Sequence, residues 1–201
     1  MKTIVLASQS TDRNLLFEQA KLPVEVLVTN IDEDQYKAKI SNSIELVKKL
    51  AEAKALNAKD SLVRQGKDAI VIAADTIVEL DNKIIGKAKN KAHAFEILKK
   101  LVDNTHNLIT GFAVTEINNS RIITDHEITS VQFINLSDDE IHDYLKSGEW
   151  KGRAGAYSIR ERASLFIKSI QGSSSNVIGL PMHRIFEILK KEFNINLLQI
   201  D

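Results

Sequence analysis

The sequence contains no cysteine, an absence that excludes disulfide bonds, zinc–thiolate sites and thiol nucleophiles together. It also lacks net charge, because 27 basic residues balance 27 acidic ones. No overall field would therefore hold the chain on nucleic acid or on an anionic membrane, and a polyanionic ligand needs a local cluster of cations. Since neither a long apolar segment nor a small-residue cleavage site is present near Met1, we expect a cytoplasmic protein with no membrane partner.

The order of the predicted elements indicates an α/β fold. Strand and helix patterns alternate over the first hundred residues, and two long antiparallel strand candidates follow at residues 106–117 and 121–134. We therefore predict a mixed parallel and antiparallel sheet flanked by helices. At 201 residues, with only two prolines and no low-complexity tract, the chain is predicted to be a single domain over residues 1–201.

Other elements are predicted from local patterns. Helices are expected at residues 43–59 and 92–102, after the capping box that begins at Ser137, and after Pro181. Shorter strands are expected at residues 3–7, 24–28, 156–159 and 165–170, whereas residues 31–34 and 172–176 are predicted to be loops.

One apolar run stands out as the carrier of chemistry. Residues 69–74 are all apolar and rich in Val and Ile, and Asp75 and Thr76 follow them directly. This pattern predicts a buried strand that delivers a carboxylate and a hydroxyl at its carboxyl end, where ligands collect in open α/β sheets. The alternative interpretation is that Asp75 only caps the turn that follows.

Cations and a second carboxylate lie at the ends of other predicted elements. Ser8, Ser10 and Arg13 fall between a strand and a helix, where unpaired N–H groups favour an anion. The alternative is that Ser10 or Thr11 is merely a helix N-cap. Lys54 lies near the apolar side of a predicted helix, and Lys87 follows a glycine that does not have P-loop spacing. Together with Asp75 and Glu33, these residues suggest a phosphate site with a divalent metal and a metal-polarised water as nucleophile.

The chain resembles the Maf family of nucleoside triphosphate pyrophosphatases over nearly its whole length. The matching segments are Leu6-Ala7-Ser8-Gln9-Ser10 with Arg13, Lys54-Ala55, Ala74-Asp75-Thr76, Gly86-Lys87, His106 with Thr110-Gly111, Ala154-Gly155-Ala156-Tyr157-Ser158-Ile159, and Asn176-Val177-Ile178-Gly179-Leu180-Pro181.

The resemblance implies a fold similar to inosine triphosphate pyrophosphatases, with a cleft between two lobes, and often a homodimer. It implies cleavage of a nucleoside triphosphate between the α and β phosphates with Mg²⁺ or Mn²⁺. By position, Asp75 would be the proton acceptor or a metal ligand, and Glu33 a second metal ligand. The phosphate-binding residues would be Ser8, Ser10, Arg13, Lys54 and Lys87. Members of this kind clear modified or pyrimidine nucleotides, and a link to cell division is expected.

Asp12, Thr76 and Arg160 fall where the family sets base preference, and at two of these positions the sequence departs from the family pattern. Asp12 replaces an arginine and Arg160 replaces a glutamine, while Thr76 matches the type that prefers dTTP and UTP. If Asp12 and Arg160 face each other they would form an ion pair; the alternative is that both are exposed and independent.

Two other functions remain open at this stage. The first is a nucleotide-binding regulator of cell division with weak or no catalysis, which the acidic Asp12 favours. The second is nucleic-acid binding, which the zero net charge and the lack of an aromatic platform disfavour.

Overall fold

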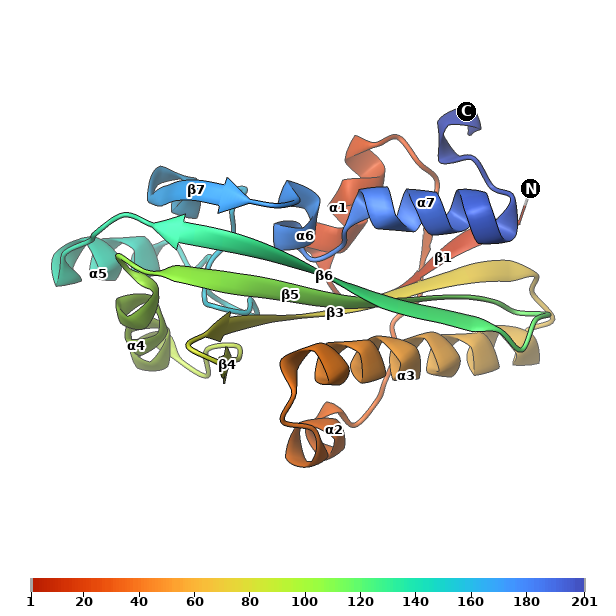
Figure 1. The fold of residues 1–201 in the computed structure, drawn as a ribbon, viewed down its shortest axis with the longest axis horizontal. Coiled ribbons are helices and arrows are strands. Elements are labelled where there is room, and N and C mark those ends of the chain that lie inside the picture. The colour runs from red at the N-terminus through yellow and green to blue at the C-terminus, as the bar shows by residue number, and fades with distance from the viewer. Residues whose placement is uncertain (1, 201) are drawn as a thin grey trace. The chain divides into compact units, whose positions relative to one another are not determined.

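The computed structural model describes residues 2–200, and its strands form a mixed sheet in the order β2-β1-β3-β5-β6-β7, with β4 paired to β3 (Figure 1). The strands are β1 (Thr3–Ala7), β2 (Glu25–Val26), β3 (Ala69–Leu80), β4 (Lys83–Ile85), β5 (Thr105–Glu116), β6 (Ile122–Phe133) and β7 (Ile167–Gln171). Because β1 is parallel to β2 and β3, whereas β4 and β7 are antiparallel to their partners, the predicted mixed sheet is confirmed.

Seven α-helices occur among the described residues: α1 (Thr11–Gln19), α2 (Glu33–Lys39), α3 (Ser43–Arg64), α4 (Lys91–Leu101), α5 (Asp138–Lys146), α6 (Ser174–Ile178) and α7 (Met182–Phe193). Two short 3₁₀ turns, η1 (Arg162–Leu165) and η2 (Leu197–Gln199), complete the list. None of these helices combines the length and the apolar character that a bilayer crossing requires.

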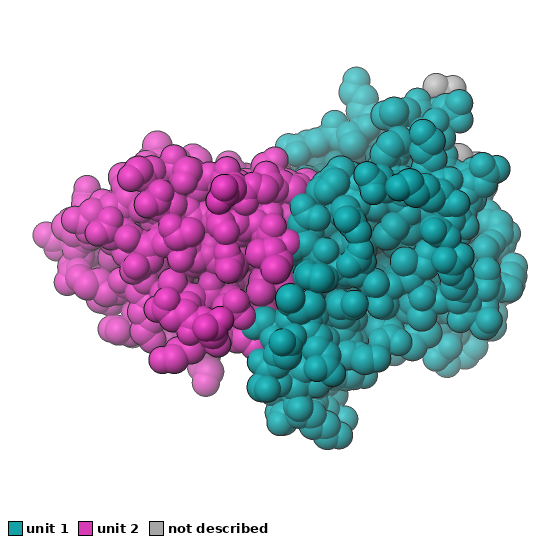
Figure 2. Space-filling view, in the orientation of Figure 1, with its two compact units in different colours: residues 1–75, 110–127, 179–201 teal, residues 76–109, 128–178 magenta. Residues whose placement is uncertain are grey.

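The described chain forms two compact units, which are coloured separately in Figure 2. Unit 1 comprises Met1–Asp75, Thr110–Glu127 and Gly179–Asp201, and unit 2 comprises Thr76–Ile109 and Ile128–Ile178. The chain passes from one unit to the other within β3, β5 and β6, so each unit owns part of these strands. That residues 1–201 act as a single domain with a cleft stays a prediction.

In unit 1, the helix α3 covers one face of the strands through small side chains. Alanines at positions 51, 55 and 58 are fully buried in a core cluster with residues of β1, β3 and β5. Gly111 of β5 allows an even closer approach, because a Cβ there would overlap the backbone of Val47 in α3. The helix backbone therefore lies directly on the strand, and this contact sets the position of everything that α3 carries.

Unit 2 has a separate core that is built around aromatic rings. Phe133 packs edge-to-face against Tyr157 and Phe166, with ring centroids 4.9 and 5.0 Å apart. Helices α4 and α5 pack against each other and contribute Leu98 and Leu145 to the same cluster. These contacts hold the loop between α5 and η1 on the sheet.

The predicted strand at residues 156–159 is wrong. Gly155 and Ala156 have φ of +69° and +60°, and this left-handed backbone cannot continue a strand. Residues 165–170 were partly mispredicted as well, because the chain forms η1 first and β7 begins only at Ile167.

Both predicted loops contain a short helix, so these two predictions are also wrong. Residues 31–34 run into α2, which begins at Glu33, and residues 172–176 run into α6, which begins at Ser174. Neither helix has an apolar stripe of helical period, so the pattern that normally reveals a helix was missing. In α2, the Asp32 side chain instead accepts hydrogen bonds from the N–H groups of Asp34 and Gln35 and so caps the helix.

Candidate active site

Asp75 lies inside β3, and not at its end as the sequence pattern predicted, because the strand continues to Leu80. The parallel pairing with β1 stops earlier: Thr3 to Ala7 pair with Ala69 to Ala73. Asp75 therefore comes two residues beyond the last pair, where β1 has turned away at Ser8. Asp75 thus lies next to the carboxyl end of β1, although it is not at the end of its own strand. Ligands collect at such strand ends in open α/β sheets.

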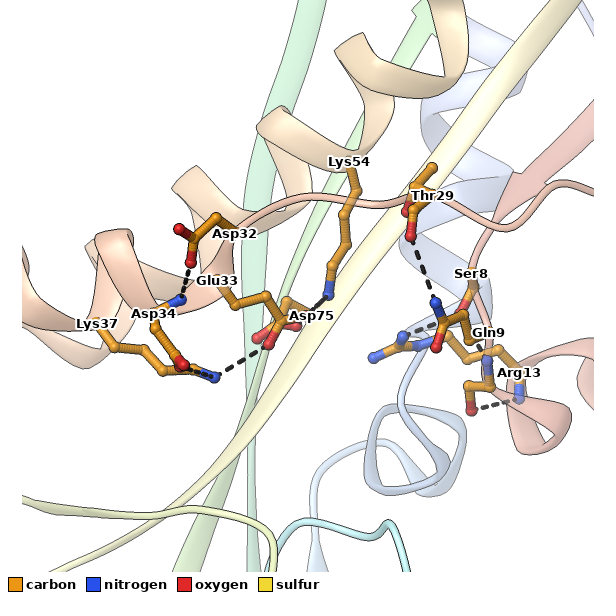
Figure 3. A network of polar contacts seen from close by, with 11 residues as sticks. Ser8, Gln9, Arg13, Thr29, Asp32, Glu33, Asp34, Lys37, Lys54 and Asp75 are labelled. Atoms are coloured by element: carbon orange, nitrogen blue, oxygen red, sulfur yellow. Dashed lines mark hydrogen bonds and ion pairs between the residues drawn. The ribbon is translucent and has the colours of Figure 1, made fainter. Parts of the chain in front are cut away.

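Lys54 of α3 reaches the Asp75 carboxylate. Its Nζ lies 2.6 Å from Asp75 Oδ1, and both side chains are only 13% exposed (Figure 3). The alanine face of α3 and the contact at Gly111 bring the helix close enough to the sheet for this bond. A lysine near the apolar side of a helix is costly to bury without a partner, and here the Lys54 ammonium meets two carboxylates, Asp75 and Glu33.

Glu33 is the second of these carboxylates. It is the first residue of α2, and its Oε1 lies 2.8 Å from Lys54 Nζ, while its Oε2 lies 3.1 Å from Lys37 Nζ. Burial raises the pKa of Glu33, but the hydrogen bonds and charges of Lys54 and Lys37 outweigh burial and lower the pKa to about 2. Glu33 is therefore ionised throughout the neutral range, and Lys54 bridges two carboxylates (Figure 3).

The turn after β1 holds Arg13 next to these charges. Ser10 caps α1 and accepts a hydrogen bond from the Arg13 backbone N–H, as the N-cap interpretation held. Ser8 Oγ accepts bonds from the Ser10 N–H at 3.1 Å and from the Arg13 guanidinium at 3.2 Å, and Arg13 Nε donates to the carbonyl of Gly179 at 2.6 Å. The hydroxyls thus organise the turn and orient the guanidinium.

Arg13 belongs to the same group of charges as Glu33, Lys54 and Asp75, because the two carboxylates act on its pKa. Burial lowers the pKa of Arg13, and the carboxylates of Asp75, Glu33 and Asp12 oppose this effect. An arginine keeps its proton at any ordinary pH, so the guanidinium is a fixed positive charge. Arg13, Glu33, Lys54 and Asp75 are the acid–base cluster of unit 1, with two positive and two negative charges in a mostly buried setting.

A divalent metal can be accommodated by this cluster only in a particular way. Within residues 2–200, no three His, Cys, Asp or Glu side chains come together as a metal cage. Mg²⁺, however, is commonly held by one or two carboxylates plus substrate phosphate oxygens and water, and never needs a sulfur or imidazole ligand. Glu33 and Asp75 fit that mode, because one oxygen of each carboxylate lies within 2.8 Å of the same atom, Lys54 Nζ.

The remaining predicted residues are not members of the acid–base cluster. Asp12 is in the first turn of α1 in unit 1, whereas Thr76, Lys87 and Arg160 belong to unit 2. Lys87 is exposed and its backbone forms an antiparallel bridge with Ala154. The Arg160 N–H donates to Ser158 Oγ at 3.4 Å. Their roles in phosphate binding and base preference, and the proposed pairing of Asp12 with Arg160, stay predictions.

Two contributors to the site were missed by sequence reasoning. Lys37 contacts Glu33 through i, i+4 spacing on α2, and this spacing would have revealed the contact if residues 33–39 had been recognised as a helix. Gly179 supplies only a backbone carbonyl to Arg13 across 166 residues of sequence, and no sequence signal indicates such a contact.

Comparisons with known proteins find relatives over nearly the whole chain. A family model described as Maf-like protein matches residues 3–192. The dTTP/UTP pyrophosphatase of Alkaliphilus oremlandii is 42% identical over 98% of this chain and 100% of its own length. The enzyme of the same name from Ruminiclostridium cellulolyticum is 38% identical over 95% of this chain and 96% of its own.

A solved structure of a nucleoside-triphosphatase, a dITP/XTP pyrophosphatase from Mycobacterium abscessus, matches 66% of this chain and 73% of its own. Its TM-score is 0.36 and its sequence identity is 13%. At these values the likeness carries no argument about this chain, and similarity to inosine triphosphate pyrophosphatases stays a prediction.

Proposed function

Since the chain belongs to the Maf-like protein family, we propose that it hydrolyses nucleoside triphosphates to the monophosphate and pyrophosphate, with dTTP and UTP as preferred substrates. The relatives that are 42% and 38% identical over almost their full lengths carry this activity in their names. The observation that carries the proposal is the Glu33–Lys54–Asp75 arrangement, in which one ammonium contacts two carboxylates beside the buried Arg13.

The chemistry assigns a task to each member of the cluster. A water adds to the α-phosphorus while the bond from this phosphorus to the oxygen that bridges the α and β phosphates breaks. Pyrophosphate leaves with that oxygen, and the monophosphate is the other product. Asp75 accepts the proton of that water, a function for which a positioned carboxylate is suited. Arg13 and Lys54 compensate the negative charge of the phosphates, and Ser8 and Ser10 keep Arg13 and its turn in place.

Glu33 and Asp75 are the residues proposed to hold a divalent cation, Mg²⁺ or Mn²⁺, together with phosphate oxygens. When bound, such a cation neutralises phosphate charge and makes a bound water more acidic. Lys54 lies between the two carboxylates and balances their charge. Lys54 therefore keeps the acceptor Asp75 in a fixed position before substrate arrives.

The test is a panel of triphosphates incubated with the purified protein and Mg²⁺ or Mn²⁺, with pyrophosphate and the monophosphate measured as products. We expect dTTP and UTP to give the highest kcat/KM and both products in equal amounts. Release of inorganic phosphate with a diphosphate would contradict the proposed bond cleavage, and an unchanged triphosphate would contradict the activity itself.

A second candidate function is nucleotide-dependent regulation of cell division with weak catalysis. One observation favours it: Asp12 lies near enough to Arg13 to oppose the effect of burial on its pKa, so it places negative charge beside a proposed phosphate-binding residue. Under this alternative, triphosphates bind in calorimetry but turn over no faster with the wild-type protein than with an Asp75→Asn variant.

The setting of the enzyme is part of the proposal. We place it in the cytoplasm, where nucleoside triphosphates are held, as a house-cleaning enzyme of nucleotide metabolism without a nucleic-acid or membrane partner. A homodimer is also proposed from the family resemblance, and light scattering at micromolar protein concentration measures it directly. The base-preference roles of Asp12, Thr76 and Arg160 are tested in the same panel, because alanine variants should change the ranking of bases more than the chemistry.

A further inference from the structure

Unit 2 contains a buried polar pair that the proposed reaction does not use. His106 of β5 is 1% exposed, and its Nε2 lies 2.8 Å from the hydroxyl of Tyr157. The imidazole also packs edge-to-face on Phe133 and Tyr157, with ring centroids 4.8 and 5.5 Å away. Because buried polar groups are costly to keep, a pair placed inside an aromatic core needs a physical reason.

The reason lies in the segment that carries Tyr157. Residues 154–158 depart from any regular structure, with Gly155 and Ala156 both left-handed. A Cβ on Gly155 would lie 2.9 Å from a methyl group of Val78, so the segment also packs tightly on β3. Left-handed backbone at a non-glycine residue such as Ala156 is strained and persists only when surrounding contacts fix it.

Two tyrosine hydroxyls hold the backbone of residues 154–158 in place. Tyr144 of α5 donates to the Ala156 carbonyl at 3.3 Å, and its hydroxyl also meets the backbone N–H of Ser158. Tyr157 is tied to His106 on the other side of the core. Burial lowers the pKa of His106 to about 4, so the ring is neutral at physiological pH and the pair stays uncharged.

This segment is joined to Lys87. Ala154, at its start, forms the antiparallel bridge with Lys87. Ile85, two residues before Lys87, and Ala88, the residue after it, pack against the same core as Tyr157. The backbone of Lys87 is therefore fixed by residues 154–158, while its side chain is exposed.

We propose that His106 and Tyr157 are positioning residues for Lys87: their hydrogen bond fixes residues 154–158, and these residues set the backbone position from which the Lys87 ammonium binds the triphosphate. The inference rests on the proposed function and on the prediction, drawn from the family resemblance, that Lys87 binds phosphate. Neither His106 nor Tyr157 contacts the substrate in this scheme, so both affect the reaction only through Lys87.

The test compares Tyr157→Phe with the wild type. This substitution removes one hydroxyl and keeps the ring contacts with Phe133 and His106. Losing one buried hydrogen bond is expected to raise KM for dTTP about 3- to 10-fold with little change in kcat. The control is Ile97→Val, which removes one methyl group from α4 in the same core and should leave KM unchanged.

A double-mutant cycle with Lys87→Ala distinguishes positioning from general destabilisation. If Tyr157 acts through Lys87, Tyr157→Phe causes no further rise of KM in the Lys87→Ala background. Additive effects on KM would overturn the proposal, and so would a wild-type KM in the Tyr157→Phe variant.

Hydrogen exchange gives a readout that does not depend on turnover. The amides of residues 86–88 and 154–158 should exchange about 3- to 10-fold faster in Tyr157→Phe than in the wild type, whereas those of α4 should not. If the wild-type protein releases no pyrophosphate, the proposed function fails, and exchange still decides the positioning. Unchanged exchange at residues 86–88 would refute it.

Discussion

The Asp75→Asn substitution separates catalysis from binding in this protein. The amide has nearly the shape of the carboxylate, so its oxygen can still accept a bond from Lys54, which now lies 2.6 Å from Asp75 Oδ1. It can neither take a proton nor bind a hard cation well. The substitution therefore removes the chemistry assigned to Asp75 while it keeps the packing around a side chain that is 13% exposed.

The size of the effect follows from the charges of the cluster. A positioned proton acceptor contributes a factor of about 10² or more, so kcat should fall by at least that factor, which equals about 2.7 kcal/mol of activation free energy. The cluster has two positive and two negative charges, and the variant keeps both cations but loses one anion. KM for a triphosphate should therefore stay the same or fall.

Stability should change little. The lost charge-assisted bond to Lys54 is worth about 1.5–3 kcal/mol, and the amide oxygen retains part of it. A net loss of about 1 kcal/mol corresponds to a Tm decrease of about 2–4 °C. Thermal unfolding followed by circular dichroism measures this shift and shows whether the variant is folded.

The assay is steady-state release of pyrophosphate from dTTP, with Asp68→Asn as the matched control. Asp68 is a carboxylate of the same unit that lies outside the cluster, with a side chain that is 53% exposed and paired with Lys2. The control should retain wild-type kcat and KM. A folded Asp75→Asn variant with unchanged kcat, or one that loses activity only through a higher KM, would refute the assignment of Asp75.

Three further predictions follow from particular contacts. Arg13→Ala should raise KM for triphosphates about tenfold or more, because it removes a buried cation beside the carboxylates. A wild-type KM in kinetic assays, together with a wild-type Kd in calorimetry, would exclude Arg13 from phosphate binding. Gly111→Ala should force α3 away from β5 at Val47 and so lower both Tm and kcat, whereas a variant with wild-type values of both would show that the Gly111 contact does not position Lys54. Burial lowers the pKa of His106 from 6.5 to about 4, so the unfolded chain binds more protons between these values. This contribution to stability is complete above pH 6.5 and is lost as the pH falls toward 4, by up to about 1.4 kcal/mol per pH unit. Urea unfolding of His106→Phe over this range should show a flatter pH dependence than the wild type, and parallel curves would contradict the neutral His106.

Local patterns in the sequence predicted most elements of this fold. Alternation and apolar runs identified β1, β3, β5 and β6. Amphipathic periodicity identified α3 and α4, and the capping box identified α5. These signals are local, because side-chain period and capping depend only on residues within a few positions of one another.

Where the local signal was weak, the tertiary structure decided. Helix α2 has no buried residue, so no apolar pattern announced it, and yet it carries Glu33 to Lys54. The strand predicted at residues 156–159 has strand-like composition, but the left-handed Gly155 and Ala156 prevent it, and contacts with Tyr144 hold that backbone. At residues 156–159, contacts with distant residues overrode the local preference. Helix α2 is instead capped locally by Asp32, and Glu33 at its start joins the distant Lys54 by an ion pair.

The candidate site shows the same division. The sequence determined which residue types are available: carboxylates at 33 and 75 and cations at 13 and 54, on a chain without cysteine or net charge. Only the tertiary structure decided that Lys54 bridges both carboxylates, and that Arg13 is anchored by a backbone carbonyl 166 residues away. The physical reason is that charge interactions act over a few ångströms of space. Distances of that kind are set by how closely α3 packs on the sheet at Gly111, and not by the spacing of residues along the chain.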